Sequence, residues 1–182
     1  MIGAVIGAAM LGGCSEKHEA NDTLPSPSAA ETTEALPALG PADFPVPDEA
    51  RTKDADGAEA LLRYWIDLSN RQQKELAGQP LRELGPDCQE CLRIARSFDE
   101  VATAGHRYRG GEITLNDVTT PVLTGDKATM SFGARQEAVQ IVDGAGNVVD
   151  PGLELMPNLG SGVTLVWSKE EHGWLVEGLN IG

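Results

Sequence analysis

Apolar residues recur at helical spacing near the middle of the chain. The positions in the first such segment are Ala58, Leu61, Leu62, Trp65, Ile66 and Leu68. Because residues three or four apart share one face of a helix, this spacing predicts a helix over residues 56–76. Asp56 and Glu59 match a capping box at its start, and Gly78 and Pro80 are expected to end it.

A second helix is predicted after Gly85 and Pro86. Asp87 is expected to be its N-cap, with Glu90 three residues later, and Gly105 is expected to close it. Its buried stripe is predicted to consist of Cys91, Leu92, Ala95, Phe98 and Ala102. The segment therefore supplies a second amphipathic helix for a core.

Beyond Arg107 the pattern changes from helical spacing to alternation, which is typical of strands with one buried face. The alternating apolar residues include Ile113, Leu115, Ala128, Met130, Phe132, Val163, Leu165, Trp167, Trp174 and Val176. Residues 150–162 are rich in Pro and Gly and are expected to form a loop that could cross the mouth of the sheet. Helices followed by strands predict an α+β fold, with two or three N-terminal helices packed on a curved, cone-like antiparallel sheet of about four to six strands.

The first residues of the chain have a different character. Residues 1–13 carry no charge, and residues 11–14 read Leu-Gly-Gly-Cys. An apolar run, small residues and then a cysteine are typical of a bacterial lipoprotein signal peptide, with a lipid on the Cys14 thiol. A basic segment is expected upstream of Met1, because none precedes the apolar run. A buried helix is the alternative, but four glycines disfavour it.

The remaining organisation follows from composition. Residues 14–42 are expected to be the lipidated cysteine and a disordered tether rich in Pro, Ala and Glu, because such a stretch buries too little apolar surface to fold. Residues 43–182 are expected to form a single globular extracytoplasmic domain, which is a usual domain size. The sequence thus predicts a protein on the extracytoplasmic face of the cell membrane, with Cys14 as its anchor.

Charge and motif content exclude several kinds of partner. The formal net charge is −14 and aromatic residues make up only 4% of the chain. This balance argues against nucleic acid and against docking on anionic lipid headgroups, so the membrane contact is expected to be the lipid itself. No phosphate-binding loop, nucleophile elbow or metalloprotease motif occurs, and no cofactor is expected.

The cysteine count supports the same compartment. Three cysteines are an odd number, and a lipid on Cys14 leaves Cys88 and Cys91 as a pair one helical turn apart. A structural disulfide is the favoured interpretation in an oxidising compartment. Two alternatives remain open: a redox-active pair, with Cys88 near a helix N-terminus, and a zinc site, which would need two further ligands.

Three motifs carry a resemblance to known proteins. They are D-G-A-E-A-L-L-R-Y-W at 56–65, G-P-D-C-Q-E-C-L at 85–92 and G-W-L-V-E-G-L at 173–179. Together they resemble an uncharacterised family of actinobacterial lipoproteins, a domain of unknown function, over most of residues 43–182. This resemblance implies an envelope lipoprotein without an assigned activity. More distantly, helices followed by a curved sheet with a G-W-x-V strand look like the cone-shaped SnoaL-like and nuclear-transport-factor-2-like fold.

A cone of this kind would enclose a pocket between helices and sheet. The candidate lining residues are Trp65, Phe98, His106 and Trp167. Plain core packing is the alternative for the aromatic residues. A catalytic alternative pairs His106 with Tyr64 or Asp67, which lie three apart on the first predicted helix.

The sequence therefore favours a non-enzymatic module that binds a small apolar ligand or another envelope protein. The alternative is a cone-fold isomerase or hydrolase, or a thiol–disulfide redox protein that uses Cys88 and Cys91. A ligand-binding cone predicts a deep apolar cavity with few titratable groups. An interaction module predicts a filled cone and an exposed apolar patch, for example along residues 153–159.

Overall fold

A computed structural model describes residues 36–182, so the predicted signal peptide, Cys14 and most of the predicted tether lie outside the described residues. The helices in the described part are η1 (Asp48–Arg51, 3-10), α1 (Ala55–Glu75), α2 (Gln79–Leu84) and α3 (Gln89–Thr103). The strands are β1 (Arg107–Gly110), β2 (Ile113–Val118), β3 (Val122–Thr124), β4 (Lys127–Gln136), β5 (Val139–Val142), β6 (Val148–Leu153), β7 (Met156–Ser168) and β8 (Gly173–Ile181).

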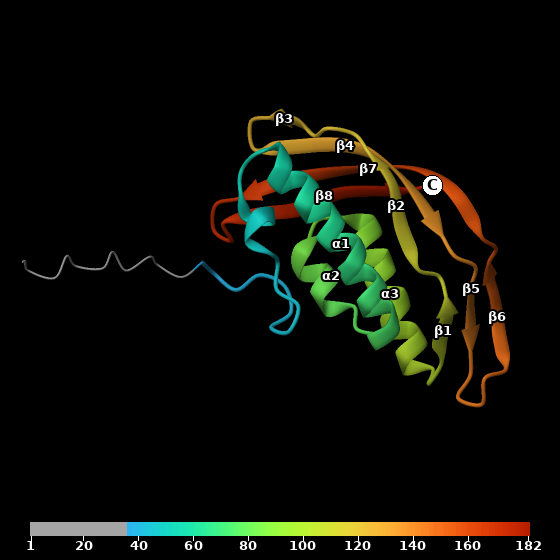
Figure 1. The fold of residues 1–182 in the computed structure, drawn as a ribbon. Helices are drawn as coiled ribbons and strands as arrows, with labels where there is room; N and C mark the ends of the chain where they lie inside the picture. The colour runs from blue at the N-terminus through green and yellow to red at the C-terminus, as the bar shows by residue number, and fades with distance from the viewer. Residues whose placement is uncertain (1–35) are drawn as a thin grey trace, which may run out of the picture. The chain divides into compact units, whose positions relative to one another are not determined.

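The strands form two antiparallel sheets. The larger has the order β2-β4-β7-β8, with β3 also paired to β4, and the smaller has the order β1-β5-β6. In Figure 1 the larger sheet arches over α1 and α3, and the smaller sheet descends beside them. The expected α+β class and the curved sheet are confirmed, and α1, α2 and α3 are three helices where two or three were expected.

The predicted number of strands was wrong: the described residues contain eight strands, where four to six were expected. Part of the difference lies in residues 150–162, which form the end of β6 and the start of β7 instead of a loop. The prolines do not prevent pairing here: Pro157 falls at a register shift between β7 and β4, where a bulge tolerates a residue without an N–H. Gly160 and Gly162 pair regularly with β4.

Both predicted helix starts also need correction. The N-cap of α1 is Asp54, whose side chain accepts the Gly57 N–H at 2.8 Å, rather than Asp56. The N-cap of α3 is Cys88 rather than Asp87, since Cys88 has an extended backbone and its Sγ accepts the Cys91 N–H at 3.1 Å. Several residues around each start can act as caps, and packing selects among them.

α2 occupies the segment whose Gly78 and Pro80 were predicted to end the first helix. Its Pro80 lies in the first turn, where a missing N–H costs nothing. Gly78, just before it, allows α2 to approach α3 closely, because a Cβ there would lie 2.3 Å from the carbonyl oxygen of Ala95. Arg82 and the Gly78 N–H both bond the carboxylate of Asp99 on α3.

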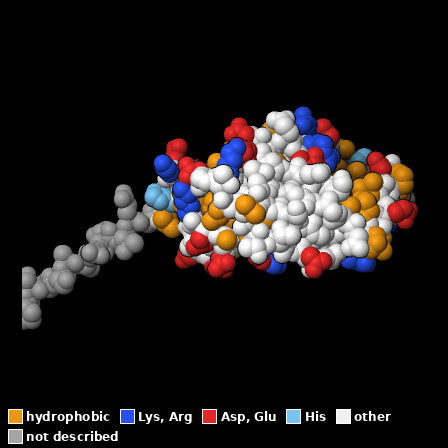
Figure 2. Space-filling view, turned by 90° about the horizontal axis from the view of Figure 1, so that it is seen from above, with side chains coloured by type: hydrophobic (Ala, Val, Ile, Leu, Met, Phe, Trp, Pro, Cys, Tyr) orange, Lys and Arg blue, Asp and Glu red, His pale blue; other side chains and the backbone are white. Residues whose placement is uncertain are grey.

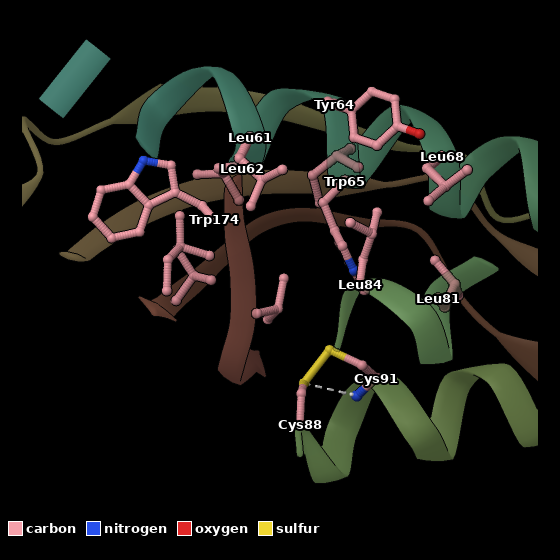
Figure 3. Close-up of a cluster of buried hydrophobic side chains, with 14 of the residues drawn as sticks. Leu61, Leu62, Tyr64, Trp65, Leu68, Leu81, Leu84, Cys88, Cys91 and Trp174 are labelled. Carbon is pink, nitrogen blue, oxygen red and sulfur yellow. Dashed lines mark hydrogen bonds between the residues drawn. A yellow bond between two sulfur atoms is a disulfide. The ribbon is translucent and has the colours of Figure 1, made fainter. Parts of the chain in front are cut away.

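The main core lies between the helices and the larger sheet. Trp65 and Trp174 are each 1% exposed, and Leu61, Leu81 and Leu84 are fully buried. Figure 3 shows these side chains converging from α1, α2 and the sheet, with the two sulfur atoms at the base of the cluster. Leu39, which belongs to the predicted tether, is 6% exposed and packs in this core.

The two sheets join through a bend in a nearly continuous ladder. The chain passes from β1 to β2, from β4 to β5 and from β6 to β7 within two residues each time, so all three crossings fall in one region. Gly152 at the third crossing has φ +62°, and a Cβ there would lie 2.0 Å from the Val139 carbonyl oxygen. Only glycine fits this position, which brings β6 against β5 as the ladder turns.

The outer face of the structure is unevenly apolar. Figure 2, which views the molecule from above, shows hydrophobic side chains gathered near its right-hand end and few charges near the centre. Strand β6 is exposed along its whole length, with Val148 and Val149 each 48% exposed. In residues 36–182 no helix is both long and apolar enough to span a membrane.

Candidate functional site

A cavity of about 500 Å³ lies at the bend between the two sheets, with α3 as its opposite wall. Its apolar lining includes Ile94, Phe98, Ile141, Leu153, Met156 and Leu159. This volume falls in the range that small-molecule sites in proteins occupy. The cavity exists because the smaller sheet turns away from the larger one instead of continuing it over the helices.

Side chains of helix α1 bond to the backbone at the bend between the two sheets. The Asn70 side chain donates to the Ile113 carbonyl at 2.7 Å and accepts the Ile113 N–H at 2.9 Å. Gln73, a lining residue, donates to the Gly110 carbonyl at 2.8 Å. These bonds satisfy backbone groups at the crossing from β1 to β2, where the pairing strand changes from β5 to β4, so side chains of the helix hold the cavity wall there.

One polar side chain lies in the buried part of the wall. Ser69 on α1 is 5% exposed and lines the cavity. Gln73, Ser97, Gln136 and Gln140 contribute further polar side chains to the lining. A few placed polar groups among apolar ones are typical of ligand sites, where they fix the orientation of the ligand.

The titratable lining residues gather in a group that we call the polar rim, which consists of Glu90, Arg93, Tyr108 and Asp150. Arg93 donates to both oxygens of Glu90, at 2.8 and 2.5 Å. Hydrogen bonding to Arg93 lowers the pKa of the Glu90 carboxyl, so this pair is ionised at neutral pH. Asp150 accepts the Gly152 N–H at 2.7 Å through Oδ1.

Tyr108 connects the rim to the apolar wall. Its ring packs edge-to-face on Phe98, with centroids 5.7 Å apart, and its hydroxyl donates to the Ser97 carbonyl at 3.3 Å. Burial raises the pKa of the Tyr108 hydroxyl, and the negative charges of Glu100 and Asp150 raise it further. The hydroxyl is therefore neutral, and its oxygen can still accept a hydrogen bond.

Of the four residues predicted to line a pocket, only Phe98 lies in this cavity. Trp65 packs in the core, where its indole points toward Leu84 (Figure 3). Trp167 packs edge-to-face on Trp174, with centroids 5.3 Å apart. His106 is half-buried just after α3 and is not among the lining residues.

The residues of the catalytic alternative are not brought together in the cavity. Tyr64 is buried, donates to the Phe44 carbonyl at 2.6 Å and has a pKa raised to about 12 by burial. Asp67 on α1 is exposed. Neither residue, nor His106, lines the cavity.

The Sγ atoms of Cys88 and Cys91 lie 2.08 Å apart and form a disulfide at the start of α3. Both residues are fully buried. Exchange with a second thiol requires access to a sulfur atom, so the pair in this conformation is shielded from such attack. Within residues 36–182, no three metal-ligating side chains are arranged to hold a metal ion.

Sequence reasoning missed most of the lining. Ile94 and Ser97 lie on α3 and line the cavity beside Phe98, but the predicted buried stripe does not include them. Met156 and Leu159 lie in the segment expected to be a loop. The signal that could have found Tyr108 is its position at the start of the strands directly after an amphipathic helix.

No family model matches the chain, so the resemblance to actinobacterial lipoproteins remains a prediction. No curated protein matches it either.

Solved structures with a similar arrangement were found. The intermembrane-space region of the chloroplast protein ARC6 has a TM-score of 0.49 and 15% identity, over 71% of this chain and 97% of that one. Aln2 from a Streptomyces species has a TM-score of 0.43 and 11% identity, over 71% and 93%. A variant of a chain named Rd1NTF2_05 has a TM-score of 0.42 and 12% identity, over 69% and 99%. All three scores are below 0.5, so the fold described above rests on the helices and strands of this chain.

Proposed function

We propose that the described domain binds a small, largely apolar ligand in the cavity at the bend. The observation that carries this proposal is a cavity of about 500 Å³ whose wall combines Ile94, Phe98, Met156 and Leu159. Removing an apolar ligand from water into such a wall is favourable in proportion to the apolar area buried.

The chemistry of the lining favours binding over catalysis. Among the described residues, no histidine or cysteine lines the cavity. Glu90 is paired with Arg93, and Asp150 is exposed. A general base or nucleophile requires a titratable group that is poised beside a partner and can reach the reacting atom.

Two exposed leucines of one segment provide the test. Leu153 is 52% exposed and lines the cavity, whereas Leu155 is 42% exposed and does not line it. The fluorescence of 1-N-phenylnaphthylamine, an apolar probe, should rise when it binds the full chain. Leu153→Glu should weaken this binding about tenfold, because it removes one apolar contact and adds a charge.

Leu155→Glu is the matched control and should bind the probe like the unsubstituted chain. The proposal is wrong if the unsubstituted chain does not raise the fluorescence of the probe, or if the two variants lose affinity for it equally.

We further propose that the domain works in the cell envelope, held there by lipid on Cys14. The support is the order of apolar, small and cysteine residues at 11–14, together with the even cysteine pair that remains. Cys14→Ser should move the protein from the membrane fraction to the medium. Retention of this variant in washed membranes would contradict the anchor.

A second candidate function is binding of another envelope protein at β6. The observation that favours it is an edge strand that is exposed throughout and carries Val148, Val149 and Leu153. Edge strands of this kind can pair with an added strand. Under this candidate, Val148→Glu would abolish a crosslink to a membrane protein without changing probe binding.

A further inference from the structure

The only basic residue on the polar rim is already neutralised. Arg93 makes a two-point contact with Glu90, so its charge and two of its donors are committed. Three of the five N–H donors of Arg93 remain, but an anion that accepted from them would also face the Glu90 carboxylate. The rim therefore offers a carboxylate or phosphate group no cation that lacks a carboxylate partner.

The remaining rim groups are acceptors. In residues 36–182, Asp150 takes part in no ion pair, and its one bond to protein uses Oδ1. The Tyr108 hydroxyl donates its hydrogen to the Ser97 carbonyl, so its oxygen remains available as an acceptor. Asp150 and Tyr108 both line the cavity, and the hydroxyl lies within reach of the negative charge of Asp150 and of the positive charge of Arg93, which Glu90 offsets.

The aromatic pair adds to this environment. Phe98 and Tyr108 both line the cavity and pack edge-to-face. The face of an aromatic ring attracts cations, including quaternary ammonium groups, because the ring quadrupole is negative there. The apolar wall lies beyond this pair.

The net charge of the described residues also favours a cationic ligand. Residues 36–182 contain 13 basic and 23 acidic residues, a net charge of −10. A field of this sign raises the local concentration of cations near the surface and lowers that of anions.

We propose that the ligand of this cavity is an amphipathic cation, with its apolar body against Phe98 and Met156 and a positively charged nitrogen beside Asp150 and Tyr108. This inference rests on the proposed function and names the chemical class of the ligand. Long-chain amines and quaternary ammonium compounds belong to this class, and fatty acids do not.

Three probes with the same ten-carbon chain test the inference: decyltrimethylammonium, decanol and decanoate. Their affinities for the full chain are measured by isothermal titration calorimetry below the concentrations at which they form micelles. Decyltrimethylammonium should bind roughly tenfold more tightly than decanoate at low salt, with decanol between them. Added salt should reduce the difference.

Asp150→Asn should reduce the affinity for decyltrimethylammonium about threefold to fivefold, the effect of one exposed charge, and leave decanol binding unchanged. An asparagine keeps an acceptor for the Gly152 N–H, so the turn is preserved. Glu154→Gln is the matched control, because Glu154 is an exposed carboxylate four residues away that does not line this cavity. It should not change the preference.

The outcomes separate the two proposals. If decanol binds but the cation has no advantage over decanoate, or keeps its full advantage in Asp150→Asn, the inference about charge is overturned and the proposed function stands. If none of the three probes binds, the proposed function fails and the inference fails with it.

Discussion

Cys88 contributes to stability in two separable ways. It closes the disulfide with Cys91, three residues away, and its Sγ accepts the Cys91 N–H at the start of α3. The chain-entropy relation gives ~2 kcal/mol for so short a loop. Loss of an N-cap acceptor typically costs ~1 kcal/mol.

Two double variants isolate these contributions. Cys88→Ala with Cys91→Ala loses both and should reduce the free energy of unfolding by ~3 kcal/mol. Cys88→Ser with Cys91→Ala restores the cap acceptor without the crosslink, so it should lose only ~2 kcal/mol. Urea denaturation followed by far-ultraviolet circular dichroism measures both values.

The comparison refutes the reasoning if the serine and alanine variants unfold at the same urea concentration. Equal values would mean that the contact between Cys88 and the Cys91 N–H does not cap the helix. A fully reduced but unsubstituted chain serves as the control. It keeps the sulfur acceptor and should resemble the serine variant.

Three further predictions concern the core and its charges. Tyr64→Phe should cost ~1 kcal/mol, because the Phe44 carbonyl loses its donor. The unsubstituted chain should also lose stability as pH rises from 10 toward 12, since the folded pKa of Tyr64 is about 12 and the unfolded value is 10.0; thermal melting against pH in both proteins checks this. Arg82 lowers the pKa of Asp99 below 3.8, so this carboxylate stabilises the fold above that pH, and the contribution is lost as pH falls through the lowered value. As the pH is lowered, the melting temperature of Asp99→Asn should fall less steeply than that of the unsubstituted chain. Leu165→Ala, at a fully buried position of β7, should cost ~3 kcal/mol in urea denaturation, and a loss below ~1 kcal/mol would contradict its place in the core.

The helices were predictable from the sequence because their apolar residues repeat with the helical period over several turns. Leu61, Leu62 and Leu68 are all buried, as the pattern indicates. The N-cap residues could not be predicted from the sequence. Asp54 and Asp56 are both suitable caps for α1, and the choice depends on which one reaches the Gly57 N–H. Local chemistry limits the possibilities, and tertiary packing selects one of them.

Strand β7 shows why the sheet was underestimated. Its Pro157, Gly160 and Gly162 are typical of a loop, yet the long partner β4 supplies hydrogen bonds along almost the whole segment. Pairing between distant segments can override local preference for individual residues. The residues of β7 alone do not indicate that β4 will pair with them.

The site was the least predictable part. Helical spacing identifies which face of α1 is buried but not what covers it, so Trp65 was assigned to a pocket and lies in the core. The cavity depends on the bend between the sheets, which Gly152 and the side chain of Asn70 help to define. Such a bend arises from contacts between residues far apart in the sequence.

Methyl-group nuclear magnetic resonance tests the central claim most directly. Decyltrimethylammonium is titrated into the full chain with labelled isoleucine, leucine, valine and methionine methyl groups. We expect saturable chemical-shift changes at Ile94, Met156 and Leu159, which line the cavity, and none at the exposed Val122 of β3 or the buried Leu61. Shifts confined to Val122 and other exposed surface methyl groups, with the three lining residues unchanged, would contradict it.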